Sequence, residues 1–399
     1  MKNIVVCFDG TWNTLDSVDT TNVVETAKLV TPTNSQGVTQ IVHYDEGVGS
    51  GHVSVSKFAD RALGGAFGIG LMNTIEDAYR FLSFNYAPGD KIFIFGFSRG
   101  AFSARSFGGL IRNSGILARE HVGRVREAVA LYQDPSPEKT PNSAHACEFR
   151  AHFGVPGFFN EKDQLWRREN RAVGPTGDSK LAIEYLGIWD TVGAMGVPGY
   201  LYFSDKINNR FRFHDTSLSS VVNSARHAVA IDEKRRVFDA TLWNNIKKLN
   251  SDLGKMELPV EERPYIQQWF PGDHGSVGGG GNVRGLCNAT LVWVLDGAIK
   301  RGLGIDAVKL EVFRKNIEYR DPTHCMAKPV FDITSLLTRR SRSGPSEPDL
   351  SDISDLARKR FAEPAANLPN KRPYRPKTLN SVAIRLADPL PANGTPRPV

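Results

Sequence analysis

The sequence predicts an α/β fold with a mostly parallel central sheet and helices on both faces. Short apolar runs rich in β-branched and aromatic residues alternate with stretches of helical apolar spacing over about residues 1–300. Several of these runs pass directly into polar turns that contain glycine. Strands that alternate with helices in this way pair in parallel. The 399 residues have room for one large domain with appendages.

The expected elements follow this alternation along the chain. Strands are expected at 3–8, 38–44, 91–95, 183–189 and 265–270, with a further extended stretch at 236–241. Helices are expected over about 71–84, 101–112, 122–132, 218–231 and 287–300. No apolar run reaches the roughly 20 residues that a membrane span requires. The first apolar run is short and ends in an acid, so it indicates a buried strand and not a signal peptide.

The most informative motif is Gly96-Phe97-Ser98-Arg99-Gly100, which lies between a predicted strand and a predicted helix. Strand, sharp turn and helix are the context of a nucleophile elbow. Glycine at positions 96 and 100 removes the side chains that such a turn has no room for. The Ser98 hydroxyl is then expected to point away from the sheet, beside the N–H groups of a helix start that favour negative charge.

A serine hydroxyl needs a base, and that base needs an orienting acid. At a nucleophile elbow these partners follow in the order Ser, Asp or Glu, His, at the ends of later strands. Asp190 directly follows the predicted strand at 183–189, and His274 lies four residues after the strand at 265–270. The sequence therefore predicts a triad of Ser98, Asp190 and His274.

Other residues compete for these roles less well. Asp273 is adjacent to His274 and cannot easily face its ring, and Asp232 resembles a solvated or ion-paired carboxylate at a helix end. The remaining histidines precede the acid, lie near the predicted helix at 218–231, or sit in a late loop: His43, His52, His121, His145, His152, His214, His227 and His324. A lone histidine of this kind is commonly a satisfied structural residue.

An oxyanion hole requires two donors. The backbone N–H of Arg99 is the first candidate, and the second is expected from the loop after the first strand, at Gly10 or Thr11. A carboxylate beside an oxyanion is unfavourable, so we expect Asp9 to accept backbone N–H groups or to pair with an arginine. A metal role for Asp9 with Asp45 or Glu46 is a weaker alternative without ligand spacing to support it.

No cofactor or metal is expected. The glycine-rich stretches 64–70 and 278–281 lack the further residues of a phosphate-binding loop or a dinucleotide fingerprint, and they indicate tight backbone near the site. The four cysteines form no Cys-x-x-Cys pair, which fits a reducing cytoplasm and gives no sign of zinc or a disulfide framework.

Two segments stand apart from the alternating pattern. Residues 118–182 include the least regular part of the body and are expected to form a cap-like insertion over the site, or a plain surface excursion. Residues 338–399 are rich in proline, and after residue 338 there are 12 Lys+Arg against six Asp+Glu, out of a net charge of +7. We expect a largely irregular, solvated basic tail appended to a catalytic domain at 1–337.

Five motifs together carry a family resemblance: 4–13, 96–101, 187–193, 227–236 and 269–280. They resemble the α/β-hydrolase family of the type VI secretion lipase effector catalytic domain, long grouped as a domain of unknown function. The resemblance implies an α/β-hydrolase-like fold and a Ser-Asp-His hydrolase, with phospholipase activity in the effector branch. One departure is that Gly275-Ser276 follows the histidine where the family usually has Ser-Asp.

The sequence thus predicts a serine carboxylester hydrolase of the lipase or phospholipase type. The alternatives are a small-molecule or carbohydrate esterase, and a non-catalytic binding or regulatory protein on the same fold. The expected substrate is an acyl ester such as a phospholipid, and the basic tail could contact an anionic membrane. No nucleic-acid motif accompanies the charge. We expect a cytoplasmic protein, with leaderless export as a further option.

Overall fold

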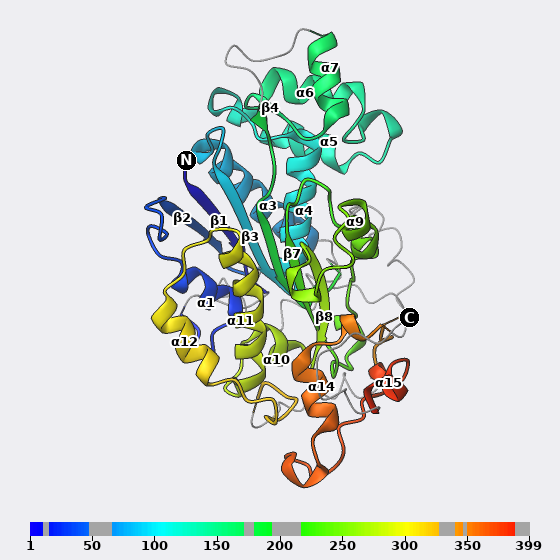
Figure 1. Cartoon of the computed structure of the whole chain (residues 1–399). Helices are drawn as coiled ribbons and strands as arrows, with labels where there is room; N and C mark the ends of the chain where they lie inside the picture. Colours follow the sequence, from blue (N-terminus) through cyan, green and yellow to red (C-terminus); the bar gives the residue numbers. More distant parts are fainter. Residues whose placement is uncertain are drawn as a thin grey trace.

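The computed structural model describes residues 1–10, 16–47, 66–170, 179–193, 217–326, 340–345 and 349–387. Its centre is one parallel sheet of six strands in the order β2-β1-β3-β6-β7-β8 (Figure 1). The strands are β1 (Asn3–Phe8), β2 (Gln40–Asp45), β3 (Lys91–Phe97), β6 (Tyr185–Trp189), β7 (Ala225–Ala230) and β8 (Tyr265–Phe270). This arrangement confirms the predicted α/β fold class.

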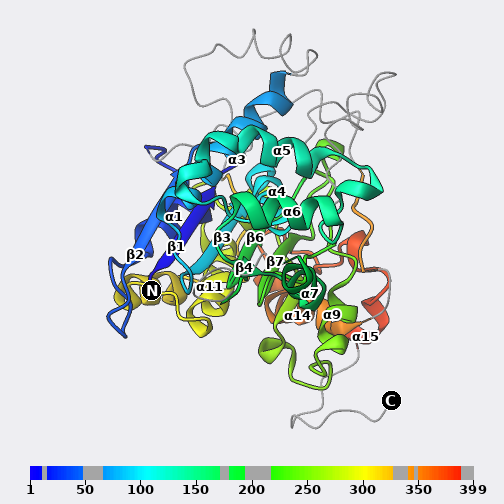
Figure 2. The same cartoon turned by 90° about the horizontal axis from the view of Figure 1, so that it is seen from above.

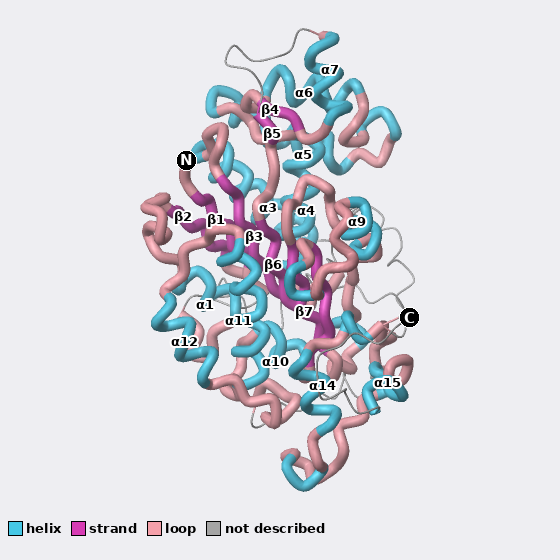
Figure 3. The backbone as a smooth tube through the Cα atoms, viewed as in Figure 1, coloured by secondary structure: helices cyan, strands magenta, loops and turns pink. Residues whose placement is uncertain are grey.

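Helices cover both faces of the sheet, as Figure 3 shows. The main ones are α1 (Asn22–Leu29), α3 (Ala66–Asn85), α4 (Arg99–Ser114), α10 (His274–Gly278), α11 (Gly285–Lys300) and α12 (Ala307–Lys315). Alternate side chains of β1 enter different cores: Ile4, Val6 and Phe8 pack with α3 and α4, whereas Val5 and Cys7 pack with α1 and α11. The continuous apolar run of β1 is therefore that of a strand buried on both faces. Among the described residues, no helix combines the length and the apolar character needed to cross a membrane.

One expected helix is a strand. Residues 218–231 were predicted to be helical, but Ala225–Ala230 is β7, paired in parallel with β6 and β8. All six residues of β7 are buried. A strand buried on both faces shows no alternation of polar and apolar residues, so the periodicity of its sequence does not separate it from a buried helix. His227 consequently lies inside the sheet.

The insertion between α4 and β6 does not cover the carboxyl ends of the strands. It contains α5 (Val125–Gln133), α6 (Ala144–Phe153), α7 (Glu161–Glu169), β4 (Gly157–Phe158) and β5 (Ser179–Lys180). It begins where α4 ends and returns where β6 begins, so both connections are at the edge where the strands start. Figure 1 shows it beside the N-terminus, and Figure 2 looks down on it from above. The described part of the insertion therefore lies opposite Ser98, which corrects the expectation of a cap over the site.

The basic segment after residue 338 is packed against the sheet over much of its described length. It contains α14 (Asp355–Ala362), α15 (Ala383–Ala387) and three short 3₁₀ turns. Its apolar side chains form a third core with Val229 and Trp269 of the last two strands; the buried members are Ile353, Ala357, Phe361, Leu368, Tyr374, Leu379 and Val382. The amide of Ser354 donates to the Trp269 carbonyl at 3.1 Å, which places this segment along the edge strand β8. The expected solvated extension is thus wrong for this part of the chain.

Candidate active site

The turn between β3 and α4 holds Ser98 in a conformation that L-residues seldom adopt. Its φ is 60° and its ψ is −122°, and α4 begins at the next residue. Strain of this kind is retained when the surrounding structure determines the backbone. The strand, turn and helix around Ser98 are those that the motif predicts.

Gly96 and Gly100 are required by close backbone contacts on both sides of this turn. A Cβ on Gly96 would lie 2.5 Å from the Gly100 carbonyl oxygen, and one on Gly100 would lie 2.2 Å from the Phe8 carbonyl oxygen. No real Cβ contact is that short, and backbone atoms cannot move aside cheaply. The end of β1 is therefore packed directly against the turn that carries Ser98.

This packing predicts that Gly100→Ala lowers the free energy of unfolding by about 1–3 kcal/mol or more, as overpacking of a dense core does. Thermal or denaturant unfolding measures the effect. Gly123→Ala is the matched control, because nothing lies within 4 Å of a Cβ at that position. Wild-type stability in the Gly100 variant would show that β1 and the turn are not in this contact.

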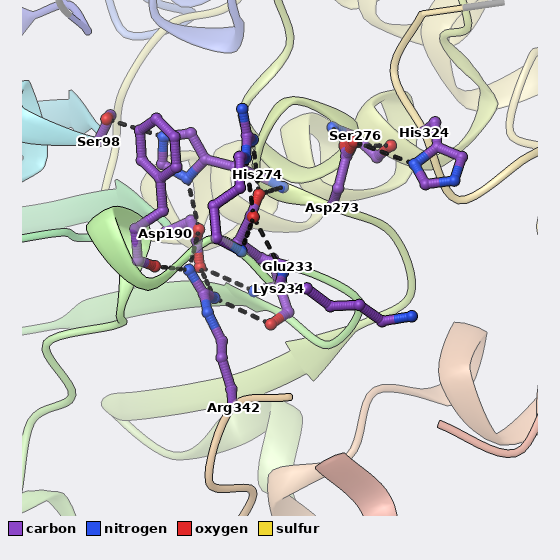
Figure 4. A network of polar contacts seen from close by, with 12 residues as sticks. Ser98, Asp190, Glu233, Lys234, Asp273, His274, Ser276, His324 and Arg342 are labelled. Atoms are coloured by element: carbon purple, nitrogen blue, oxygen red, sulfur yellow. Dashed lines mark hydrogen bonds and ion pairs between the residues drawn. The ribbon is translucent and has the colours of Figure 1, made fainter. Parts of the chain in front are cut away.

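The structure brings His274 and Asp190 to Ser98 (Figure 4). The Nε2 atom of His274 is 2.8 Å from Ser98 Oγ, and its Nδ1 atom is 2.5 Å from Asp190 Oδ2. An ionised carboxylate only accepts, so Nδ1 carries a proton and Nε2 of the neutral ring accepts the serine hydroxyl proton. The ring lies between Phe97 and Phe238, with centroid distances of 4.6 and 4.7 Å. These contacts fix the plane of the imidazole.

Asp190 follows β6, is fully buried and has a φ of 38°. Its Oδ1 atom accepts the Ala230 amide at 2.9 Å. The Arg342 guanidinium binds both carboxylate oxygens, with Nη1 2.6 Å from Oδ1 and Nη2 2.9 Å from Oδ2. Burial alone would raise the pKa of the Asp190 carboxyl, but Arg342 and the hydrogen bond with His274 hold that pKa below its usual range.

Arg342 is the residue of this site that the sequence did not reveal. It lies in the segment expected to be a solvated tail, and no motif surrounds it. Its side chain is nevertheless buried, with 5% of the residue exposed. Only the three-dimensional packing of residues 340–345 brings it to Asp190.

The competing histidine and acids have other partners. His227 is buried in β7, where burial lowers its pKa to about 3, and its Nε2 accepts the Thr191 amide at 3.2 Å. Asp273 caps α10 by accepting the Ser276 amide at 2.8 Å. Asp232 is not an ion-paired helix end: it accepts the Gly272 amide and the Tyr374 hydroxyl, at 2.8 and 2.7 Å. These groups hold the loops around the site.

Glu233 also contributes to the support of His274. Its Oε2 accepts the His274 amide at 3.2 Å, and it forms an ion pair of 2.6 Å with Arg235. Gly275-Ser276 follows the histidine where the family usually has Ser-Asp. The glycine has a local cause, because a Cβ on Gly275 would lie 2.4 Å from Cys325 Sγ. The Ser276 hydroxyl donates to Asp273 Oδ1 at 2.9 Å.

The residues expected to bind an oxyanion are placed only in part. Arg99 is the first residue of α4, so its amide lies at the helix start. The Gly10 amide instead donates to Asp9 Oδ1 at 2.6 Å, and Thr11 lies outside the described residues. Asp9 also accepts the Thr21 and Tyr44 hydroxyls, each at 2.7 Å. Burial raises the pKa of Asp9 to about 6, against the opposing effect of these hydrogen bonds.

The glycines after His274 lie close to the site, as expected. A Cβ on Gly278 would overlap the Phe97 ring at 1.9 Å, and Gly279 has a φ of 85° beside the backbone of Thr21. The other glycine-rich stretch, 64–70, falls almost wholly outside the described side chains. Within the described ranges, no three His, Cys, Asp or Glu side chains gather so as to hold a metal ion.

Comparison with known proteins gives one family match over most of the chain. The model described as "T6SS, Phospholipase effector Tle1-like, catalytic domain" matches residues 2–297. An uncharacterized protein of Saccharomyces cerevisiae, YEL023C, is 30% identical over 251 residues, which are 59% of this chain and 32% of the yeast protein. The chain thus spans about a third of the length of that relative.

Two solved structures are also similar. The crystal structure of an uncharacterized protein from Pseudomonas aeruginosa aligns with a TM-score of 0.39 and 16% identity, over 76% of this chain and 46% of that chain. The structure of the Tle1 effector bound to the VgrG spike of the type 6 secretion system aligns with a TM-score of 0.35 and 21% identity, over 71% and 52%. The family match agrees with the resemblance inferred from the five motifs. The chain belongs to the family of type VI secretion phospholipase effector Tle1-like catalytic domains.

Proposed function

We propose that this protein is a serine ester hydrolase that cleaves phospholipid acyl esters through Ser98, His274 and Asp190. The observation that carries the proposal is the continuous chain of contacts from the Ser98 hydroxyl through both ring nitrogens of His274 to a buried carboxylate. This is the arrangement by which a hydroxyl becomes nucleophilic at neutral pH. The phospholipid class is supported by the family to which the chain belongs.

The proposed reaction has two halves. Ser98 Oγ attacks the ester carbonyl while its proton passes to Nε2 of His274, and Asp190 holds the ring and stabilises the imidazolium. The imidazolium then protonates the leaving alcohol, which departs and leaves an acyl-serine. Water repeats the sequence: His274 takes its proton, the acyl–oxygen bond to Ser98 breaks, and the serine recovers its hydrogen as the carboxylic acid is released.

The developing oxyanion is assigned to the Arg99 amide at the start of α4, where the helix dipole favours negative charge. The second donor to the oxyanion is assigned to the loop after β1, at Gly10 or Thr11. The Gly10 amide would have to leave the Asp9 carboxylate to serve in this way. Thr11 is therefore the simpler assignment of the two.

Described parts of the C-terminal segment suggest how the protein would reach an anionic lipid surface. Several cations on it are exposed: Lys359, Lys371, Arg372, Arg375, Lys377 and Arg385. Each basic residue near an anionic bilayer contributes about 1 kcal/mol to binding. We propose that the exposed face of this segment, whose apolar side chains pack on β7 and β8, is the membrane-contacting part of the protein.

The test compares anionic phospholipid vesicles with a soluble short-chain ester. We expect phospholipid hydrolysis by the wild type, and we expect Arg372→Glu with Lys377→Glu to weaken vesicle binding and interfacial hydrolysis at least about tenfold. The soluble ester should be cleaved at an unchanged rate. Arg126→Glu with Lys162→Glu, two exposed cations of the insertion at the opposite edge of the sheet, is the matched control. Cleavage of soluble esters alone would favour a small-ester hydrolase, and no turnover of any ester would contradict the proposed function.

A further inference from the structure

Arg342 and His274 both bind the Asp190 carboxylate: they share Oδ2, and Arg342 also binds Oδ1. We propose that Arg342 is a positioning residue, supplied by the C-terminal segment, whose fixed positive charge keeps the His274 ring neutral and ready to accept the Ser98 proton. This inference rests on the proposed function of the triad. It also places a necessary part of the site beyond residues 2–297, the part of the chain that the family shares.

The geometry shows that Arg342 is held in a single orientation. The two terminal nitrogens of its guanidinium bind the two oxygens of Asp190, the forked arrangement that arginine forms with a carboxylate. Nη1 also donates to the Ala230 carbonyl at 2.9 Å, and Nη2 donates to the Phe238 carbonyl. The Phe238 ring stacks on His274. One side chain therefore fixes both the acid and one wall of the imidazole pocket.

The net charge of the buried site depends on whether the His274 ring is protonated. With the imidazole neutral, Arg342 and Asp190 cancel and the group of three carries no net charge. Protonation of the ring would leave one uncompensated positive charge among residues that are at most 6% exposed, which is unfavourable. Without Arg342, the neutral state of the remaining pair would instead be the one with the ring protonated.

The surrounding charges do not reverse the effect of Arg342, which is to disfavour protonation of His274. Glu233 approaches the His274 amide, but it is paired with Arg235. Asp273, the neighbouring residue, faces His324 at 3.6 Å. Further charges act on the members of the group from a greater distance: Asp239 and Glu233 on Arg342, and Arg105 on the adjacent His227. Arg342 contacts the Asp190 carboxylate directly through both oxygens, whereas these other charges are paired or act from a distance.

If Arg342 only anchored the C-terminal segment, replacing it would change stability alone. If it positions the triad, replacing it also changes the protonation of His274. We would follow this protonation by NMR of 15N-labelled histidine, assigned with His274→Gln. In Arg342→Met we expect the midpoint of this titration to move upward by at least about one pH unit relative to the wild type. Arg342→Lys retains the charge and should titrate close to the wild type.

Arg360→Met is the matched control. Arg360 is another buried arginine of the same segment, and its Nη1 donates to the Asp321 carbonyl at 2.7 Å, away from the triad. We expect it to lower stability without moving the His274 midpoint. An unchanged midpoint in folded Arg342→Met would overturn the inference. The NMR titration does not depend on turnover, so it remains decisive even if no ester is hydrolysed and the proposed function itself fails.

Circular dichroism establishes folding before each titration. If Arg342→Met does not fold, Arg342→Gln replaces it with the same expected upward shift. If neither neutral variant folds, Arg342→Lys decides by steady-state kinetics. A single ammonium cannot hold both Asp190 oxygens as the fork does, so we expect kcat to fall at least about tenfold at an unchanged KM. Wild-type kcat in the lysine variant would overturn the positioning role.

Discussion

Ser98→Ala is expected to lower kcat/KM for any ester substrate by at least about 10⁴-fold while the protein remains folded. The substitution removes the atom that attacks the carbonyl and leaves the oxyanion donors and the substrate site in place. The Ser98 hydroxyl is hydrogen-bonded to His274 Nε2 at 2.8 Å. Alanine is no larger than serine, so the tight turn between Gly96 and Gly100 should be preserved. Initial rates and a thermal melt of the same preparation measure both effects.

Ser103→Ala is the matched control for this variant. Ser103 lies one turn further along α4 and is also buried, but its hydroxyl donates to the Arg99 carbonyl and does not contact His274. Its rate should stay within a few-fold of the wild type. Ester hydrolysis by Ser98→Ala at the wild-type rate would place the nucleophile elsewhere.

Asp190→Asn is expected to damage both activity and stability. Asparagine cannot hold the ring in the tautomer that accepts the serine proton, a change that costs about 10⁴-fold in a serine triad. It also leaves the buried Arg342 charge without its partner, and breaking one side of a buried ion pair costs about 3–5 kcal/mol. The folded-state pKa of Asp190 is depressed, so its stabilising contribution is present above the ordinary pKa of aspartate and is lost as the pH falls towards the depressed value.

Asp163→Asn separates the two effects. Asp163 and Arg150 form a second buried ion pair, 2.7 Å long with side chains 0% and 2% exposed, in the insertion at the opposite edge of the sheet. Its loss should lower the melting temperature to a similar degree and leave kcat/KM of the folded protein unchanged. Equal activity losses in the two variants would mean that Asp190 acts only through stability.

The parts of the site that follow local rules could be predicted from the sequence. Ser98 can be recognised in the sequence because its turn needs glycine on both sides and lies between a buried strand and a helix. Asp190 and His274 could be found because parallel strands bring their carboxyl ends to one edge, so residues that directly follow later strands meet there. The structure places both of them in contact with each other and with Ser98.

The parts that depend on long-range packing could not be predicted. β7 is buried on both faces, and its sequence Ala-Arg-His-Ala-Val-Ala shows no strict alternation of polar and apolar residues, so periodicity does not separate it from a helix. The insertion lies at the edge where the strands start because α4 ends at that edge of the sheet. Arg342 belongs to a segment whose proline and charge content indicated solvent exposure, and its widely spaced apolar residues form a core only when they meet Val229 and Trp269. No short sequence motif predicts these long-range contacts.

The catalytic assignment is tested most directly by treating the folded protein with a fluorophosphonate and locating the adduct by peptide mass spectrometry. We predict one adduct per chain, on Ser98, formed at a rate that falls steeply in His274→Ala, because the hydroxyl reacts only when Nε2 takes its proton. No adduct on the folded wild type, or an adduct on another serine that forms equally well without His274, would contradict the assignment.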